Sequence, residues 1–174
     1  MKHEASPCRR LLLLSLLCLA AFAARAVAVT VVGPTCEGAP GKDVKASVSV
    51  KGAKNLGALQ MELVYDPDVL DAEDVLDGQL LSGAIVEHNV VAPGRLRIAL
   101  VAGEPVSGDG ELVEVTFAVR KGATGKSAID FEHGRAWEHE TNQEVLVTAE
   151  PGTFTVTAGA PAVEPTEAQA PVAQ

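Results

Sequence analysis

Carboxylates gather in the segment after residue 65, where a calcium site would need closely spaced oxygen ligands. The acids of this segment are Asp66, Asp68, Asp71, Glu73, Asp74 and Asp77. Calcium takes several oxygen ligands, and an EF-hand loop adds a central glycine and a closing glutamate. This segment has neither of them in place. We therefore interpret it as a turn followed by a solvated acidic face, with no metal bound.

Histidines and glutamates gather a second time around residue 135. The group consists of Glu132, His133, Glu138, His139 and Glu140, with His88 elsewhere in the chain. Two histidines and a carboxylate are enough for a zinc site in principle. Gly134 and Arg135 interrupt the pattern, however, and nothing fixes a third ligand. Surface residues around a loop are the interpretation that we adopt.

The residues required for catalysis are not assembled by any recognisable motif. A nucleophilic serine needs a base and an orienting acid, and Ser82, Ser107 and Ser127 stand outside any G-x-S-x-G motif. Glycoside hydrolysis needs two facing carboxylates, and no pair can be nominated. We predict a protein that is not an enzyme and has no cofactor.

Aromatic residues are scarce, and Trp137 is the only tryptophan. Carbohydrate-binding sandwiches stack sugar rings on several exposed aromatic side chains. The aromatic content of 3% argues against a flat polysaccharide-binding face. Trp137 lies close to Arg135 and Glu138, so it is a candidate anchor for a protein interface. A partly buried residue at the rim of the fold is the alternative.

Alternating side chains predict the strands that must position these groups. The clearest case is residues 56–65, with Leu59, Met61, Leu63 and Tyr65 on one face and Gln60, Glu62 and Val64 on the other. Asp66-Pro67-Asp68 ends this strand, because proline fixes φ and aspartate favours turns.

Similar patterns predict further short strands along the chain. They cover residues 29–32, 43–51, 84–91, 95–102, 112–119, 129–131 and 153–157, and residues 135–140 and 144–148 flank a further turn. Turns or loops are expected at residues 52–55, 93–94, 103–110 and 142–143. The acidic stretch 70–81 is the one place where a short helix or turn is expected.

Eight or nine short strands separated by turns predict an all-β sandwich or barrel. We expect antiparallel pairing throughout, on the basis of the period of two that the strands share. The inward side chains should then be buried together, namely Leu59, Met61, Leu63, Val113, Val115 and Phe117.

The chain has 174 residues, the size of one domain with an extension at each end. Basic residues precede an apolar run at 11–24, and Ala26-Val27-Ala28 is a small-x-small cleavage site. We predict a signal peptide at 1–28, a domain at 29–158 and a disordered Pro/Ala/Glu tail at 159–174. Leu17 disfavours a lipid anchor on Cys18. The mature protein should be secreted, extracellular or periplasmic, without a membrane anchor.

Cleavage after Ala28 would leave 10 basic and 22 acidic residues, which moves the net charge from −9 to −12. We do not expect such an acidic chain to bind nucleic acid or an anionic membrane. Cys36 would be the remaining cysteine. An internal disulfide is then impossible, and a passive thiol near the first strand is favoured over a cross-link between chains.

Four segments in the same order resemble the cohesin family. The first is Tyr-Asp-Pro-x-Val-Leu at 65–70, which follows Leu56-Gly57, and the second is Pro40-Gly41-Lys42-Asp43-Val44. The third combines the run 95–101 with Ser107-Gly108-Asp109-Gly110 and the run 112–117. The fourth is Gly152-Thr153-Phe154-Thr155-Val156. The resemblance covers residues 29–157. It implies a nine-stranded jelly-roll sandwich that binds dockerins, which are small calcium-binding helical modules, on one flat face formed by strands three, five, six and eight.

The resemblance also implies which residues meet the partner. That face would carry Gln60, Glu62, Val64, Arg95, Arg97 and the outward residues of 84–91. We add Trp137 to these candidate partner-binding residues as a candidate anchor. The family often carries Asn and Asp on strand three, where this chain has Ala58 and Gln60, so an unrelated protein partner is an alternative.

We predict an exported, non-catalytic module that binds a protein, dockerin-like if the resemblance holds and linked to polysaccharide-degrading assemblies. Polysaccharide binding is the second hypothesis, and a purely structural role is the third.

Overall fold

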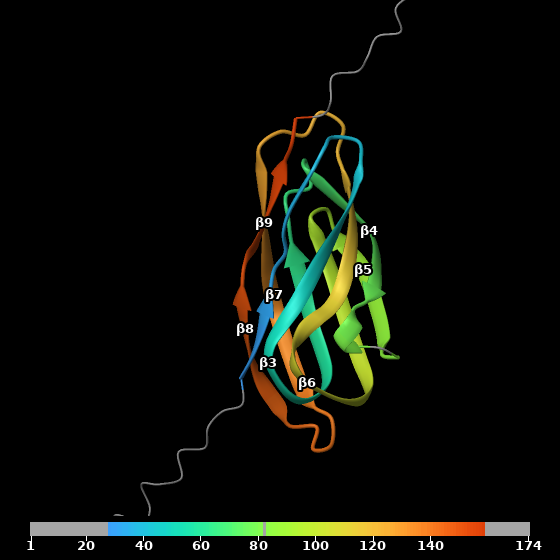
Figure 1. Cartoon of the computed structure of the whole chain (residues 1–174), viewed down its shortest axis with the longest axis vertical. Coiled ribbons are helices and arrows are strands. Elements are labelled where there is room, and N and C mark those ends of the chain that lie inside the picture. Colours follow the sequence, from blue (N-terminus) through green and yellow to red (C-terminus); the bar gives the residue numbers. More distant parts are fainter. Residues whose placement is uncertain (1–27, 82, 159–174) are drawn as a thin grey trace, which may run out of the picture.

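The computed structural model describes residues 28–81 and 83–158, which form nine strands and one short 3-10 helix (Figure 1). The predicted signal peptide, except for Ala28, and the predicted tail lie outside these residues. Within the described ranges, no helix has the length and hydropathy needed to cross a membrane.

The strands follow one another with short connections. In chain order the elements are β1 (Ala28–Val32), β2 (Thr35–Gly38), β3 (Asp43–Val64), β4 (Leu70–Asp77), η2 (Gln79–Leu81), β5 (Ile85–Ala92), β6 (Arg95–Val119), β7 (Lys126–Glu138), β8 (Glu144–Glu150) and β9 (Gly152–Val156).

Two long strands, β3 and β6, belong to both layers of a sandwich (Figure 1). Residues 43–50 of β3 pair with residues 110–118 of β6 in a layer that also contains β8, β1 and β4. Residues 58–64 of β3 pair with residues 95–101 of β6 in the other layer, together with β5 and β7. At the far edge of that layer, β9 joins β7 to β2.

The core fills the space between the layers with the residues that alternation placed inward. The six predicted core residues are each at most 1% exposed, namely Leu59, Met61, Leu63, Val113, Val115 and Phe117. Tyr65 packs against Phe117 edge to face, with ring centroids 5.2 Å apart. These observations confirm the predicted all-β sandwich and the faces assigned to its two central strands.

Both long strands turn a corner as they pass from one layer to the other. Gly52 and Asn55 adopt positive φ there, and the pairing register shifts four times between Val48 and Ala58. The Asp109 carboxylate accepts a hydrogen bond from the Gly52 N–H (2.7 Å). The Ser107 hydroxyl accepts one from the Asn55 N–H (2.9 Å). These bonds satisfy donors that the irregular ladder leaves open.

The predictions of a turn at 52–55 and a loop at 103–110 are therefore wrong, because neither segment interrupts its strand. Both segments continue as bent strand, with the residues of β6 running without interruption from Arg95 to Val119. Glycine-rich sequence usually marks a loop. Here it supplies the bends that let two paired strands change layer together.

The prediction of antiparallel pairing throughout is also wrong. β1 pairs parallel to β8, with Val29 opposite Val147, and β2 pairs parallel to β9, with Cys36 opposite Phe154. Alternation identifies a strand but not its partner. These partners are more than a hundred residues apart in the chain, so no hairpin turn fixes their relative direction.

The acidic stretch 70–81 differs from its prediction over most of its length. Residues 70–77 form strand β4, which pairs with β6 and buries Leu70 and Val75, and only 79–81 form a short helix. A bulge between Ala72 and Asp74 breaks the alternation. Because of this bulge, the sequence of β4 lacks the period of two that marks a regular strand.

Replacement of a core side chain should reveal the inward face of β3. Leu63 is fully buried, so Leu63→Ala should lower the free energy of unfolding by about 2–5 kcal/mol. Val101 is 55% exposed, and Val101→Ala should change it by less than about 0.5 kcal/mol. Chemical denaturation measures both variants. Equal losses would contradict the assignment of faces.

Candidate protein-binding face

One layer of the sandwich presents a flat outer surface made by β5, residues 95–101 of β6, residues 58–64 of β3 and β7. We call it the outer face. Opposed residues in an antiparallel pair share a face, so the register sets side chains in rows. The rows are Ile85–Val101–Ala58–Trp137, Glu87–Ala99–Gln60–Arg135, Asn89–Arg97–Glu62–Glu132 and Arg95–Val64–Asp130.

All six residues predicted to meet a partner lie on this outer face. They are Gln60, Glu62, Val64, Arg95, Arg97 and Trp137. The structure therefore brings together residues from three strands that are widely separated in sequence. Their role in binding remains a prediction.

Glu62 lies on the outer face but is only 5% exposed. Two arginines cover its carboxylate. Arg97 donates from Nε (3.0 Å) and Nη2 (2.6 Å) to Oε1. Arg95 donates from Nη1 to Oε2 of Glu62 (3.3 Å) and to Oε2 of Glu132 (2.8 Å). The sequence predicted an exposed glutamate, because alternation gives the direction of a side chain and not what its neighbours cover.

These contacts favour the charged forms of Glu62 and Arg95. The hydrogen bond from Arg97 holds the pKa of Glu62 below its usual range, although burial opposes this shift. The hydrogen bond and charge of Glu132 raise the pKa of Arg95. Charge-assisted bonds from a planar guanidinium also fix its orientation. The network is therefore set before any partner arrives.

A second group of side chains makes an apolar row at one end of the outer face. Ile85 is 65% exposed and Val101 is 55% exposed, while Ala58 and Trp137 are half-buried. The Arg135 guanidinium lies 5.1 Å from the Trp137 ring centroid and is held by Glu144 at 2.9 Å. Large exposed apolar side chains that are contiguous indicate an interaction surface.

Sequence reasoning missed Val101 as a residue of this row. The signal was present, because the outward alternation of Arg95 and Arg97 continues through Ala99 to Val101.

The described residues do not assemble the metal sites that were considered. Within 28–81 and 83–158, no group of three or more His, Cys, Asp or Glu side chains is placed to hold a metal ion. The acids of β4 are spread along a strand. His133 is exposed, with positive φ, and His139 contacts the Gly103 carbonyl through Nε2 (3.2 Å).

A model of the cohesin domain matches residues 28–156. The chain belongs to the cohesin family. No curated protein matches it in sequence.

Solved structures of other cohesins have the same fold as this cohesin. A non-cellulosomal cohesin from the archaeon Archaeoglobus fulgidus is 26% identical, covers 74% of this chain and 91% of its own, and superposes with a TM-score of 0.67. CaCohA2 from Clostridium acetobutylicum is 27% identical, with coverages of 75% and 91% and a TM-score of 0.64. CaCohA2 in complex with an arginine-to-aspartate variant of CaDoc0917 gives 26% identity, coverages of 74% and 99%, and a TM-score of 0.67.

Two of the motif residues, Asp66 and Gly57, act in the scaffold of this cohesin. Asp66 caps its turn by accepting from the Asp68 N–H (2.8 Å). Gly57 allows a close backbone approach, since a Cβ there would lie 2.4 Å from the Cα of His139. That approach aligns the end of β7 with β3 and places Trp137 beside Ala58. The motifs thus position the outer face without forming most of it.

Acid should reveal the pairing of Glu62. Its pKa is below the ordinary value of 4.5 in the folded chain, so the pairing contributes fully above pH 4.5 and is lost as the pH falls through the folded pKa. The free energy of unfolding of the wild type should therefore fall more steeply in acid than that of Glu62→Gln. Urea denaturation between about pH 3 and pH 6 measures both. Parallel curves would contradict the pairing.

Proposed function

We propose that this cohesin is a non-catalytic module that binds a dockerin-like protein through its outer face. The observation that carries the proposal is the exposed apolar row lying beside a prearranged network of ion pairs on one rigid layer. Protein interfaces combine a desolvated centre with a polar surround in this way. The complex of CaCohA2 with CaDoc0917 supports the class of partner.

The two parts of the outer face have different tasks in this proposal. The apolar row loses water when the partner docks and supplies affinity. The arginines and glutamates supply orientation and exclude partners with mismatched charge. Because Glu62 already fixes both arginines, little side-chain entropy is lost on binding.

Polysaccharide binding receives less support from the same surface. Trp137 is the one aromatic side chain in the rows of the outer face, and Arg135 lies over its ring. A sugar ring would have to displace that guanidinium, and no second ring extends the platform.

The proposal includes export and the absence of catalysis. The basic start, apolar run and small-x-small site of the sequence support cleavage after Ala28 and a secreted or periplasmic location. Three arginines of the outer face are held in ion pairs, Arg95 and Arg97 with Glu62, Arg95 also with Glu132, and Arg135 with Glu144. This arrangement is suited to recognition.

A charge placed in the apolar row should weaken binding. Val101→Asp should weaken the free energy of binding by about 1–3 kcal/mol, because the carboxylate would be desolvated at the centre of the interface. Leu76→Asp is the matched control, since Leu76 is 47% exposed on the opposite layer. Arg97→Glu should weaken the free energy of binding by a similar amount, because the new carboxylate would repel Glu62 and would have the wrong charge for the partner.

Calorimetry with a panel of recombinant dockerins, CaDoc0917 first, measures these affinities, with insoluble polysaccharides as a parallel bait. Equal losses for Val101→Asp and Leu76→Asp would place the site elsewhere. Retention on polysaccharide with no dockerin bound by the wild type would reverse the ranking of the two functions.

A further inference from the structure

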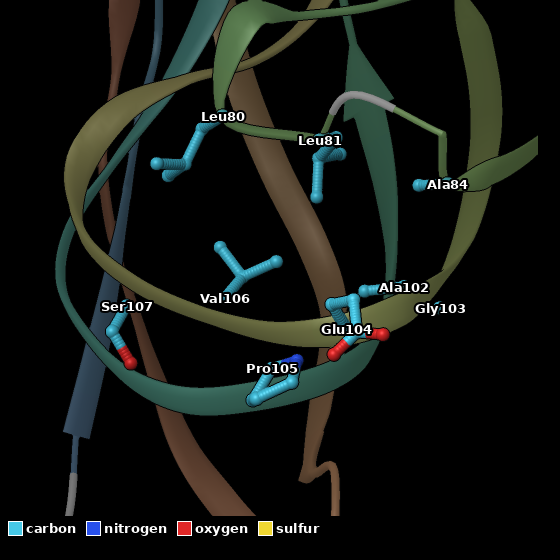
Figure 2. Close-up of a pocket in the computed structure, with 9 residues that line it drawn as sticks. All are labelled: Leu80, Leu81, Ala84, Ala102, Gly103, Glu104, Pro105, Val106 and Ser107. Atoms are coloured by element: carbon cyan, nitrogen blue, oxygen red, sulfur yellow. The ribbon is translucent and has the colours of Figure 1, made fainter.

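A pocket of about 200 Å³ opens where η2 meets the bend of β6 (Figure 2). Leu80 and Leu81 point into it from the η2 segment, and Val106 points toward them from β6. Glu104 lies on the opposite wall. The remaining lining comes from Ala84, Ala102, Gly103, Pro105 and Ser107.

The pocket adjoins the apolar row of the outer face. Ala84 and Ala102 line it, and the residues next to them, Ile85 and Val101, are paired and exposed on the outer face. Successive side chains of a strand point to opposite sides. The pocket therefore lies next to the Ile85–Val101 pair but opens on the other side of the layer's edge. A partner that covers Ile85 and Val101 would therefore end beside its mouth.

The lining selects one kind of chemical group. Leu81, Ala102 and Val106 are buried and aliphatic, so the floor favours an apolar group. Glu104 is exposed at the wall and makes no ion pair or side-chain hydrogen bond with any described residue. A carboxylate in this position favours a cation next to the apolar group.

The size of the pocket limits what can occupy it. Sites for small molecules and cofactors usually enclose about 300–1,000 Å³. The smaller volume here suits one side chain of a larger molecule. An oligosaccharide would also need a stacking ring, and the lining contains no aromatic residue.

We propose that this pocket is a second contact site for the protein partner. It takes a branched aliphatic side chain of the partner, while Glu104 pairs with a neighbouring Lys or Arg of the same molecule. The identification of the partner as dockerin-like rests on the proposed function. The preference of the pocket for an aliphatic group next to a cation does not.

A small probe tests the chemistry without the partner. Isoamylammonium carries a branched alkyl group and a cation, and isovalerate carries a similar group and an anion. We expect isoamylammonium to shift the methyl NMR signals of Leu80, Leu81 and Val106 saturably. Isovalerate should bind about three-fold more weakly or worse, as expected for one exposed charge pair. Equal binding of the two probes, or shifts of equal size at Leu76, would overturn the proposal.

Two variants separate the floor of the pocket from its charge. Glu104→Gln should remove the preference for the cation and keep the shifts. Ala84→Leu should fill the pocket and abolish the shifts with both probes. Glu73→Gln, an exposed acid of β4, is the matched control and should behave as wild type. A preference for the cation that survives Glu104→Gln would contradict the role given to Glu104.

The same variants distinguish this site from the outer face. With a dockerin that binds the wild type, Glu104→Gln should weaken binding about two- to five-fold, less than Val101→Asp does. Unchanged affinity in both Glu104→Gln and Ala84→Leu would overturn the pocket while leaving the outer face in place. Binding of isoamylammonium without binding of any dockerin would support the pocket and reject the proposed class of partner.

Discussion

The corner at which β3 and β6 change layer together is the constraint on which the rest of this cohesin depends. Two paired strands that run through both layers tie the layers into one body. The corner is stabilised because Asp109 and Ser107 accept hydrogen bonds from backbone N–H groups that the bend would otherwise leave without partners. Glycines in the same segment permit the bend, so the motif at 107–110 serves the scaffold.

A rigid corner gives the outer face its fixed geometry. Glu62 and Trp137 come from β3 and β7, and each is held by arginine: Glu62 by Arg95 and Arg97, Trp137 by Arg135. A binding surface built this way orders few side chains on association. Recognition then depends on which side chains occupy the rows, and the scaffold can remain the same while the partner changes.

Prediction from the sequence succeeded where a local pattern decides the structure. The period of two identified the buried faces of β3 and β6, because a one-residue error would move Leu59, Met61 and Leu63 into solvent. It failed where distant residues decide. The parallel partner of β1 is β8, the bulge at Ala72 hides β4, and the cover over Glu62 comes from arginines on another strand. The face of the candidate site was therefore predictable, but its ion-pair network was not.

The positions of the first and last strands determine how the domain resists tension. β1 begins at one end of the long axis and β9 finishes at the other (Figure 1). A load applied between Ala28 and Val156 would pull β1 along its own length past β3 and β8, and β9 past β2 and β7. In that shear geometry the hydrogen bonds of each ladder share the force and must rupture together. Under such a load the unfolding rate of the domain, and not its equilibrium stability, would set how long it holds.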